Sequence, residues 1–304
     1  PVSTAAGLRR AFLLALSPGI ATYSAELGLV LRDGRLEIPW PSEPFRSAPV
    51  SRNRPYRQFD GYDQESYLEH IRGLHDAFLH SRLRDDLRFI GAALERAGDL
   101  RSGTVEDAIR IAIACHDIGK LGQNWQKWAA EWQQLLAREH GDQFRQWKAP
   151  LAHTDYKAQR DRELERRVQT KRPPHACESA WLAGPFVAET LGGGYLAENP
   201  PARAVVAAIA RHHGATAQQA QPIKLVSGAL QHIDETLKLL GAGRAWSYDL
   251  TAIDTELSEI TALKDPDTIT MVSDDSTKEI EIWLYFLIVR ALRLADGRSF
   301  HYRH

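Results

Sequence analysis

Adjacent ionisable residues at the end of an apolar stretch are the first chemical feature of this sequence. The segment ACHDIGKLGQNW (114–125) follows a run rich in Ile and Ala and places His116 beside Asp117. Burying an imidazole and a carboxylate in such surroundings is costly unless a partner compensates them. A divalent metal ion is the obvious partner, because transition metals favour imidazole together with carboxylate. The rest of the chain must then supply further ligands.

Other helical stretches also carry histidine or aspartate on their apolar faces. Residues spaced at i, i+3, i+4 and i+7 share one face of a helix. By this criterion His70 faces inward, whereas His75, later in the same stretch, points away. The inward-facing candidates across the chain are His70, His116, Asp117, His175, His212, His213 and Asp296.

The joint occurrence of these seven residues is better explained by a metal cluster than by a separate structural role for each. A lone histidine on an apolar face is more often a hydrogen-bonded core residue, and Asp296 alone could cap a helix. Seven ligands exceed the capacity of one ion, so we expect two ions bridged by Asp117 and roughly 3.5–4 Å apart. Mn, Fe, Co or Ni suit these ligands, with Mg or Zn as alternatives. Such ions would lower the pKa of a bridging water and neutralise charge on a scissile phosphate.

The elements that must position these residues are predominantly helical. The chain has 304 residues, 43% hydrophobic and 25% charged, which is an ordinary globular composition. Helical spacing of apolar residues from about residue 64 nearly to the end predicts an all-α bundle. The predicted helices span 64–80, 83–97, 104–117, 121–139, 175–190, 200–213, 225–240, 251–263 and 278–296.

The N-terminal region has a different pattern. Residues 1–19 are predicted to form an amphipathic helix instead of a signal peptide, because their apolar stretch is short. Residues 27–40 are predicted to form a small β-hairpin with its turn at Asp33-Gly34. The following segment is rich in Pro, Ser and Arg and is predicted to be a linker, 41–63. The predicted division is an N-terminal part, 1–63, and a helical domain, 64–304.

Bulk properties narrow the function classes. The formal net charge is −1, so no global basic field points to nucleic acid, although a local basic patch remains compatible. No apolar run is long enough to span a membrane. Cys115 and Cys177 are the only cysteines, which argues against a disulfide framework and favours a reducing cytoplasm. The sequence has no P-loop motif and therefore no sign of an ATPase.

Five sequence blocks, taken in order, resemble the HD superfamily of metal-dependent phosphohydrolases. Within it they are most similar to the HD nuclease domain of the CRISPR-associated type I helicase–nuclease, which degrades DNA captured by the surveillance complex. The similarity covers about residues 65–300. The blocks are His70, HDIGK (116–120) with the nearby Asn124-Trp125-Gln126, HACESA (175–180), RHHGA (211–215) and RLADGRS (293–299).

This resemblance implies an HD-type bundle with metal-dependent nuclease activity. Lys120 would contact a substrate phosphate or stabilise the transition-state oxyanion; the structural alternative is a solvated helix lysine. The implied partners are single-stranded DNA, the CRISPR surveillance complex and a helicase domain on the same or a separate chain. The start at Pro1 fits excision from such a fusion or a stand-alone nuclease. The implied ligand sets are His70, His116, Asp117 and Asp296 for one ion, and Asp117, His175, His212 and His213 for the other.

The chain between His116 and His175 is longer than the family pattern leads us to expect. Residues 150–174 form the insert, which would be either an ordered loop over the site or a partly disordered basic arm. His153 and Asp155 within it are candidates for groups that support the ligands or contact the substrate.

Aromatic and basic residues flank the candidate site. Trp125, Trp128 and Trp132 follow helical spacing, which is more typical of core packing than of base stacking. Six basic residues precede His175 and would either hold a phosphate backbone or belong to a solvated helix that also carries acidic residues. They are Arg160, Arg162, Arg166, Arg167, Lys171 and Arg172.

Three alternative functions stay open. A cyclic-dinucleotide phosphodiesterase of the HD-GYP kind shares the HDIGKLG wording and the double histidine, but here Gly214 is followed by ATAQQAQ and not by Tyr-Pro. An HD nucleotide triphosphohydrolase normally needs one histidine, the HD pair and a final aspartate, which would leave the extra histidines unexplained. A non-enzymatic module would keep the site only to hold the fold or dock a partner.

Overall fold

The computed structural model describes most of the chain. The described residues are 21–24, 28–31, 61–80, 83–168, 171–192, 196, 199–214, 217, 220–244, 246–258 and 276–299. The predicted helix at 1–19 and most of the predicted linker at 41–63 lie outside them. None of the described helices is long and apolar enough to cross a membrane.

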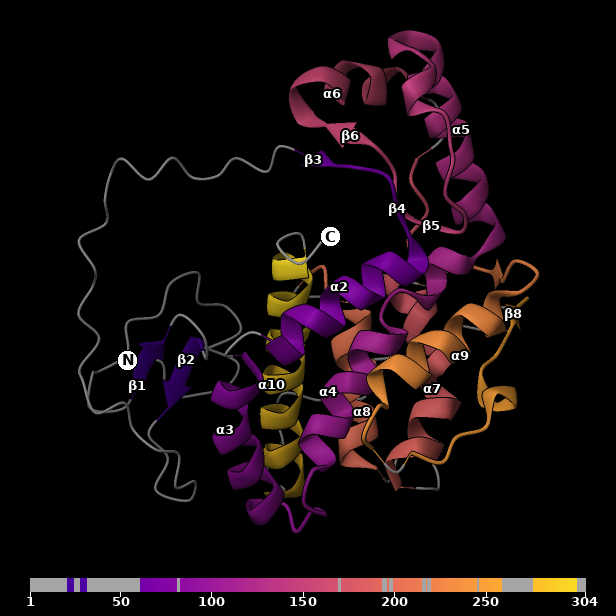
Figure 1. Cartoon of the computed structure of the whole chain (residues 1–304). Coiled ribbons are helices and arrows are strands. Elements are labelled where there is room, and N and C mark those ends of the chain that lie inside the picture. The colour runs from indigo at the N-terminus through magenta and orange to yellow at the C-terminus, as the bar shows by residue number, and fades with distance from the viewer. Residues whose placement is uncertain are drawn as a thin grey trace.

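Helices packed around an apolar core form the body of the molecule (Figure 1). They are α2 (Tyr67–His80), α3 (Leu83–Ala97), α4 (Thr104–Cys115), α7 (Ala176–Gly192), α8 (Pro200–Ala210), α9 (Ala229–Leu240) and α10 (Ser276–Ser299). α8 contacts α4, α7 and α10, and α2 contacts α9 and α10. Strands in the described residues occur only as short antiparallel pairs. The predicted all-α fold is therefore confirmed.

The helix that leads to the HD pair ends just before it. α4 ends at Cys115, and His116 and Asp117 form a turn before the 3₁₀ helix η1 (Ile118–Leu121). A Cβ on Gly119 would lie only 2.4 Å from the backbone oxygen of His175. Because a side chain would clash there, this glycine permits the close approach of α7 to the HD turn.

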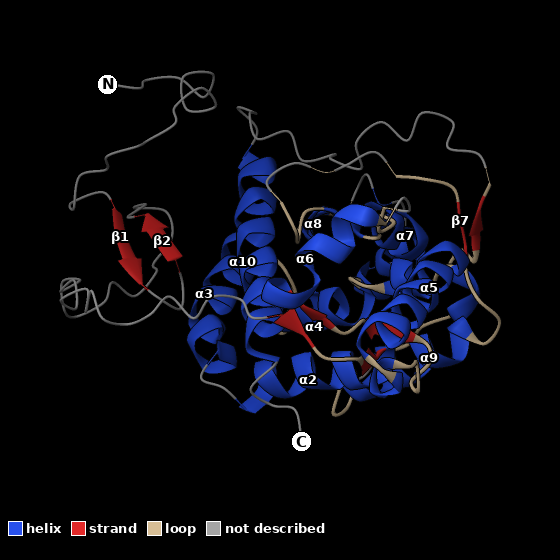
Figure 2. Cartoon of the chain, turned by 90° about the horizontal axis from the view of Figure 1, so that it is seen from above, coloured by secondary structure: helices blue, strands red, loops and turns tan. Residues whose placement is uncertain are grey.

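A small lobe covers one end of the bundle (Figure 1). It contains α5 (Gln123–His140), α6 (Ala158–Arg167) and the strand pairs β3 (Gly61–Tyr62) with β6 (Tyr156–Lys157) and β4 (Glu65–Ser66) with β5 (Leu151–His153). Seen from above, α6 projects over the middle of the bundle (Figure 2). The described part of the insert at 150–174 thus forms strands and a helix, as its ordered alternative predicts. The division at residue 63 stays a prediction, although β3 precedes it and pairs with β6.

The tryptophans of α5 serve mainly as core. Trp125 is 2% exposed and packs on Leu151 of β5. Trp132 is 4% exposed and packs on Leu164 of α6. Core packing is confirmed for these two residues, whereas Trp128 between them is only partly buried. The lobe is therefore fixed to α5 by large aromatic side chains, with one indole left accessible.

One strand forms within the predicted hairpin, 27–40, and it pairs with a strand that precedes it. β2 (Gly28–Leu31) pairs with β1 (Ala21–Ser24), which precedes it, and Ser24 lies opposite Gly28. The predicted turn at Asp33-Gly34 and the strand after it lie outside the described residues. Thr22 and Tyr23 favour the extended conformation, and they lie between the predicted helix, 1–19, and the predicted hairpin, 27–40.

The predicted helix at 251–263 is also wrong over its described part. Leu250–Ala252 form one 3₁₀ turn, η4, and β8 (Glu256–Leu257) pairs with β7 (Ile223–Lys224). The Asp249 carboxylate accepts a hydrogen bond from the Thr251 backbone N–H. Such local bonding competes with helix propagation, and strand pairing across the chain then replaces the helix. α9 likewise begins at Ala229 and not at 225.

Candidate metal centre

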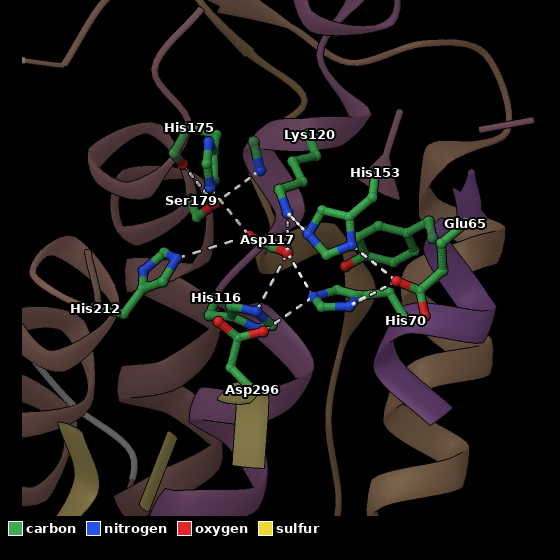
Figure 3. A network of polar contacts seen from close by, with 12 residues as sticks. Glu65, His70, His116, Asp117, Lys120, His153, His175, Ser179, His212 and Asp296 are labelled. Carbon is green, nitrogen blue, oxygen red and sulfur yellow. Dashed lines mark hydrogen bonds and ion pairs between the residues drawn. The ribbon is translucent and has the colours of Figure 1, made fainter. Parts of the chain in front are cut away.

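The bundle brings all the predicted ligands together at one end. Figure 3 shows Asp117 at the centre, with histidines from several elements pointing toward it. Each side chain comes from the end of its helix or from the adjoining turn, so a helix terminus sets its position. The contributions are His70 from α2, His116 and Asp117 after α4, His175 before α7, His212 and His213 after α8, and Asp296 near the end of α10.

One oxygen of Asp117 faces the first ligand set. Asp117 Oδ2 lies 3.0 Å from His70 Nε2 and 3.2 Å from His116 Nε2. Asp296 Oδ1 lies 3.8 Å from His70 Nε2. The ligand atoms of His70, His116 and Asp296 lie within 4.8 Å of one another, a grouping that could hold a metal ion.

The other oxygen of Asp117 faces the second set. Asp117 Oδ1 lies 3.2 Å from His175 Nε2 and 3.8 Å from His212 Nε2. His213 Nε2 lies 2.8 Å from His175 Nε2. The ligand atoms of these four residues also lie within 4.8 Å of one another. The second grouping is the second ligand set that the resemblance implies, and the first grouping is the first set without Asp117, whose Oδ2 lies beside it.

Buried polar atoms that lack a well-formed hydrogen bond favour a bound cation at this centre. Both carboxylate oxygens of Asp117 and the Nε2 atom of His212 are buried and have no well-formed hydrogen bond among the described residues. Such orphaned atoms each cost about 1–3 kcal/mol, and more where the group is charged. A bound cation would satisfy them, because imidazole nitrogen and carboxylate oxygen are both good ligands for divalent transition metals.

Backbone carbonyls fix the orientation of two imidazoles. His116 Nδ1–H donates to the Ile113 carbonyl at 2.9 Å, and His212 Nδ1–H donates to the Ile209 carbonyl at 2.6 Å. A histidine that donates through one ring nitrogen presents the lone pair of the other. In both residues that other atom is Nε2, which faces Asp117. This arrangement is the usual support of metal-binding histidines.

The protonation states of most groups also fit metal ligands. Burial lowers the pKa of His175 and of His213 to about 3, and it lowers that of His212 too. Neutral imidazoles bind metals, whereas protonated ones do not. Although burial acts to raise the pKa of Asp117, its electrostatic interactions with His116 and Lys120 hold that pKa well below its usual range. Its carboxylate is therefore ionised.

His70 differs from the other histidines. Burial acts to lower its pKa, but close contacts with the carboxylates of Asp117 and Glu65 outweigh burial and raise the pKa to about 9. Glu65 faces Nδ1, whereas Asp117 faces Nε2, where it holds a proton in competition with a metal ion. Occupation of the first set requires that proton to leave.

Lys120 is a buried member of the centre. Its side chain is 2% exposed, and Nζ lies 2.7 Å from Asp117 Oδ2 and 3.4 Å from His153 Nε2. The Gln126 amide donates to the Lys120 carbonyl at 2.7 Å and to the Leu151 carbonyl at 2.8 Å, which ties η1 to β5. The alternative of a solvated lysine is therefore wrong.

Glu65 and Tyr62 are site residues that sequence reasoning missed. The His153 Nδ1–H donates to Glu65 Oε2 at 2.8 Å, and the same oxygen lies 3.4 Å from His70 Nδ1. The ring of Tyr62 stacks on His153 at 4.4 Å. Glu65, His70 and His153 form a further grouping of metal-binding type. The only sequence signal was an acidic residue just before the helix that carries His70.

Two other residues lie outside the centre. Asp155 accepts hydrogen bonds from the side chains of Gln64 and Gln133, so it holds the insert in place. His75 does not join the cluster, as predicted, but it is 9% exposed and pairs with Asp76 at 2.8 Å. The His75 side chain therefore points away from the site but is still buried.

The fold and this centre define a helical metal-dependent hydrolase of the HD type. The model of the Cas3 HD domain family matches residues 72–291, which is most of the chain, so the chain belongs to this family. It is accordingly a metal-dependent nuclease domain, with nucleic acid as its class of substrate and CRISPR as its context. His70 and Asp296 lie just outside the matched residues and join the centre through the fold. Neither the curated proteins nor the solved structures include a significant match.

Proposed function

We propose that the chain cleaves phosphodiester bonds of single-stranded DNA at a centre of two divalent transition-metal ions. The observation that carries this proposal is the position of Asp117, whose two oxygens face two separate ligand sets. A carboxylate so placed is suited to bridging two ions. The alternative of one ion would leave one of these buried sets uncompensated.

The donor atoms favour Mn, Fe, Co or Ni, with Mg or Zn as alternatives. His70, His116, Asp117 and Asp296 would hold one ion, and Asp117, His175, His212 and His213 the other. When bound, such ions supply Lewis acidity and activate water as a nucleophile. The ionised Asp117 and the neutral imidazoles of the second set provide ligands for this role without proton loss.

Protein groups around the ions would bind the substrate phosphate. The cavity over Asp117 has a volume of about 210 Å³, and its lining includes Lys120, Arg172 and His213. Lys120 would donate to the phosphate oxygen on which negative charge develops. Arg172 is exposed and would meet the strand at the entrance.

The size of this cavity favours a strand over an enclosed nucleotide. Sites that enclose a whole drug-sized ligand usually have about 300–1,000 Å³, whereas the cavity over Asp117 has about 210 Å³. A single phosphodiester with its flanking sugars fits a cavity of this size better than a cyclic dinucleotide. A buried catalytic aspartate also favours a flexible single strand over a duplex.

The proposal extends to partners and location. In the family context, single-stranded DNA would be delivered by the CRISPR surveillance complex and a helicase domain on the same or a separate chain. Cys115 and Cys177 are buried free thiols, which fits the cytoplasmic location expected for such an enzyme.

Metal replacement with two substrates tests the proposed activity. The protein is stripped with EDTA, and Mn, Co, Ni, Mg or Zn is added back separately in the presence of circular single-stranded DNA or cyclic di-GMP. We expect a transition metal to restore cutting of the circle, with a duplex circle as the resistant control. Hydrolysis of the dinucleotide alone would replace the proposal by a signalling phosphodiesterase. Metal binding without turnover of either substrate would favour a docking module.

A further inference from the structure

A second pocket lies beside the metal centre, in the small lobe. It has a volume of about 370 Å³, and its lining includes the aromatic residues Tyr62, Trp128, Trp132 and Tyr156. Tyr62 and Arg172 line both this pocket and the cavity over Asp117. A chain molecule bound at the metal centre would therefore pass these two residues and reach the aromatic pocket next.

The aromatic walls of this pocket are held in place by their neighbours. The rings of Trp128 and Trp132 stack with centroids 6.5 Å apart and planes 15° apart. Trp132 is anchored because its indole N–H donates to the Asp155 carbonyl at 2.7 Å. Tyr62 is stacked on His153 in the same way, with planes 13° apart. Flat, pre-positioned rings of this kind are the usual platforms for single-stranded bases.

Charge is distributed in the order that a nucleotide chain requires. The Arg172 guanidinium lies 5.7 Å from the Trp125 ring centroid and 5.8 Å from that of Trp128. Arg172 is exposed at the junction of the two cavities, and the neighbouring Lys171 lines the aromatic pocket. The acidic Glu165 in the lining accepts a hydrogen bond from the Tyr156 hydroxyl at 3.0 Å. The Arg172 cation thus stands between the metal centre and the aromatic pocket, where a phosphate would lie between two nucleosides.

We propose that this aromatic pocket binds one unpaired base of the DNA strand next to the scissile phosphate, while Arg172 binds the intervening phosphate. The inference rests on the proposed nuclease function and names a substrate subsite for it. Stacking tolerates all bases, so the pocket would favour unpaired strands over duplexes without selecting a sequence. A base paired in a duplex could not enter it.

Replacing Trp128 tests the pocket without touching the metal ligands. Trp128→Ala is compared with Trp147→Ala, which removes an indole that is 71% exposed and lines neither cavity. Three quantities are measured: binding of labelled oligothymidylate in EDTA, its cleavage with metal, and hydrolysis of bis(p-nitrophenyl) phosphate. We expect Trp128→Ala to weaken oligonucleotide binding and raise its KM about 10-fold, with the small ester hydrolysed as before. Trp128→Phe should restore most of the binding.

A scan of abasic nucleotides then locates the bound base. In the wild-type protein, one missing base at a fixed distance from the cut should reproduce the loss of binding. In Trp128→Ala that abasic position should cause no additional loss, because the stacking contact is already absent.

The results of these experiments distinguish failure of the proposed base-binding pocket from failure of the proposed nuclease activity. Oligonucleotide binding that is unchanged in Trp128→Ala overturns the subsite, even if cleavage proceeds. Weakened binding without a position-specific abasic effect also overturns it, and would assign the pocket to another occupant such as a protein partner. Binding that depends on Trp128, with no hydrolysis of either substrate, supports the subsite and refutes the nuclease proposal.

Discussion

Two aspartates near opposite ends of α4 are similarly buried but differently compensated. Asp107, in the first turn, is 3% exposed and accepts hydrogen bonds from Arg244 Nε at 2.6 Å and Trp246 Nε1 at 2.9 Å. Asp117, past the last turn, is 1% exposed, and neither of its oxygens has a well-formed hydrogen bond among the described residues. Lys120 provides only an ion pair at 2.7 Å.

The helix dipole sharpens this difference. The N-terminal end of a helix stabilises an anion, and the C-terminal end disfavours one. Asp107 thus has both the dipole and its protein partners in its favour, which makes it a structural residue. Asp117 has a less favourable place, and within the protein Lys120 pairs with only one of its oxygens, so bound cations would complete its compensation. Burial alone therefore does not reveal function.

The largest expected effect is that of Asp117→Ala. Loss of the bridging carboxylate should reduce cleavage by at least about 10³-fold, while circular dichroism shows the helical fold retained. Metal should no longer raise the melting temperature, since stabilisation by a ligand requires that the folded protein bind it. Asp107→Ala is the matched control and should keep cleavage; equal losses in both variants would contradict the distinction between the two aspartates.

Lys120→Met should have the next largest effect. Removing one positively charged donor to the developing oxyanion is expected to lower kcat about 10²-fold, with metal content unchanged. Lys224→Met, at an exposed lysine paired with Glu256, is the control. If Lys120→Met instead loses metal, the lysine acts by placing Asp117 and does not act on the substrate.

Glu65→Gln tests the support of the first ligand set. Outer carboxylates of this kind typically contribute about 10–100-fold to metal affinity or activity. The loss should affect the ion held by His70 and leave the other ion bound. The control is Glu69→Gln, at an exposed residue of α2 that pairs with Lys148, and it should change the binding of neither ion. Loss of both ions in Glu65→Gln would show that the two sets are not separate.

Asp107→Ala should lower stability without lowering the activity per folded molecule. The change leaves the guanidinium of Arg244 without its carboxylate, and we expect a loss of about 2 kcal/mol. This corresponds to a fall in melting temperature of about 4–8 °C. An unaltered melting temperature would mean that Asp107 does not stabilise the fold.

The smallest effect concerns pH. Burial acts to raise the pKa of Asp107, but Arg244, Trp246 and Arg101 lower it below its usual value. A carboxylate whose pKa is lowered by folding stabilises the protein above its unfolded pKa of about 3.9 and loses that contribution as pH falls through the folded value. The stability difference between wild type and Asp107→Ala should therefore shrink below about pH 4. A difference that grows on acidification would contradict this sign.

Helical periodicity predicted most of the bundle and the residues that gather in the candidate metal centre. His70, His175 and Asp296 each share a face with apolar residues, and burying that face carries them inward. The helix at 83–97 has the predicted bounds. Where local side-chain bonding or strand pairing overrides periodicity, as at Asp249, the prediction fails.

Contacts between distant segments could not be read from a single sequence. Glu65 meets His153 only because β4 pairs with β5, and these two residues are separated by 88 positions. Tyr62 reaches the centre through the pairing of β3 with β6. Two-residue strands carry too little pattern to reveal their partners. The insert thus looked peripheral in sequence, although it forms one wall of the site.

Metal content per chain tests the central claim most directly. Wild type, Asp117→Ala and Asp107→Ala are loaded with Mn, freed of unbound ion by gel filtration and measured by elemental analysis. The account predicts two ions per chain in wild type and Asp107→Ala, and a loss of both in Asp117→Ala. One ion in wild type, or two retained in Asp117→Ala, would contradict the bridging role of Asp117.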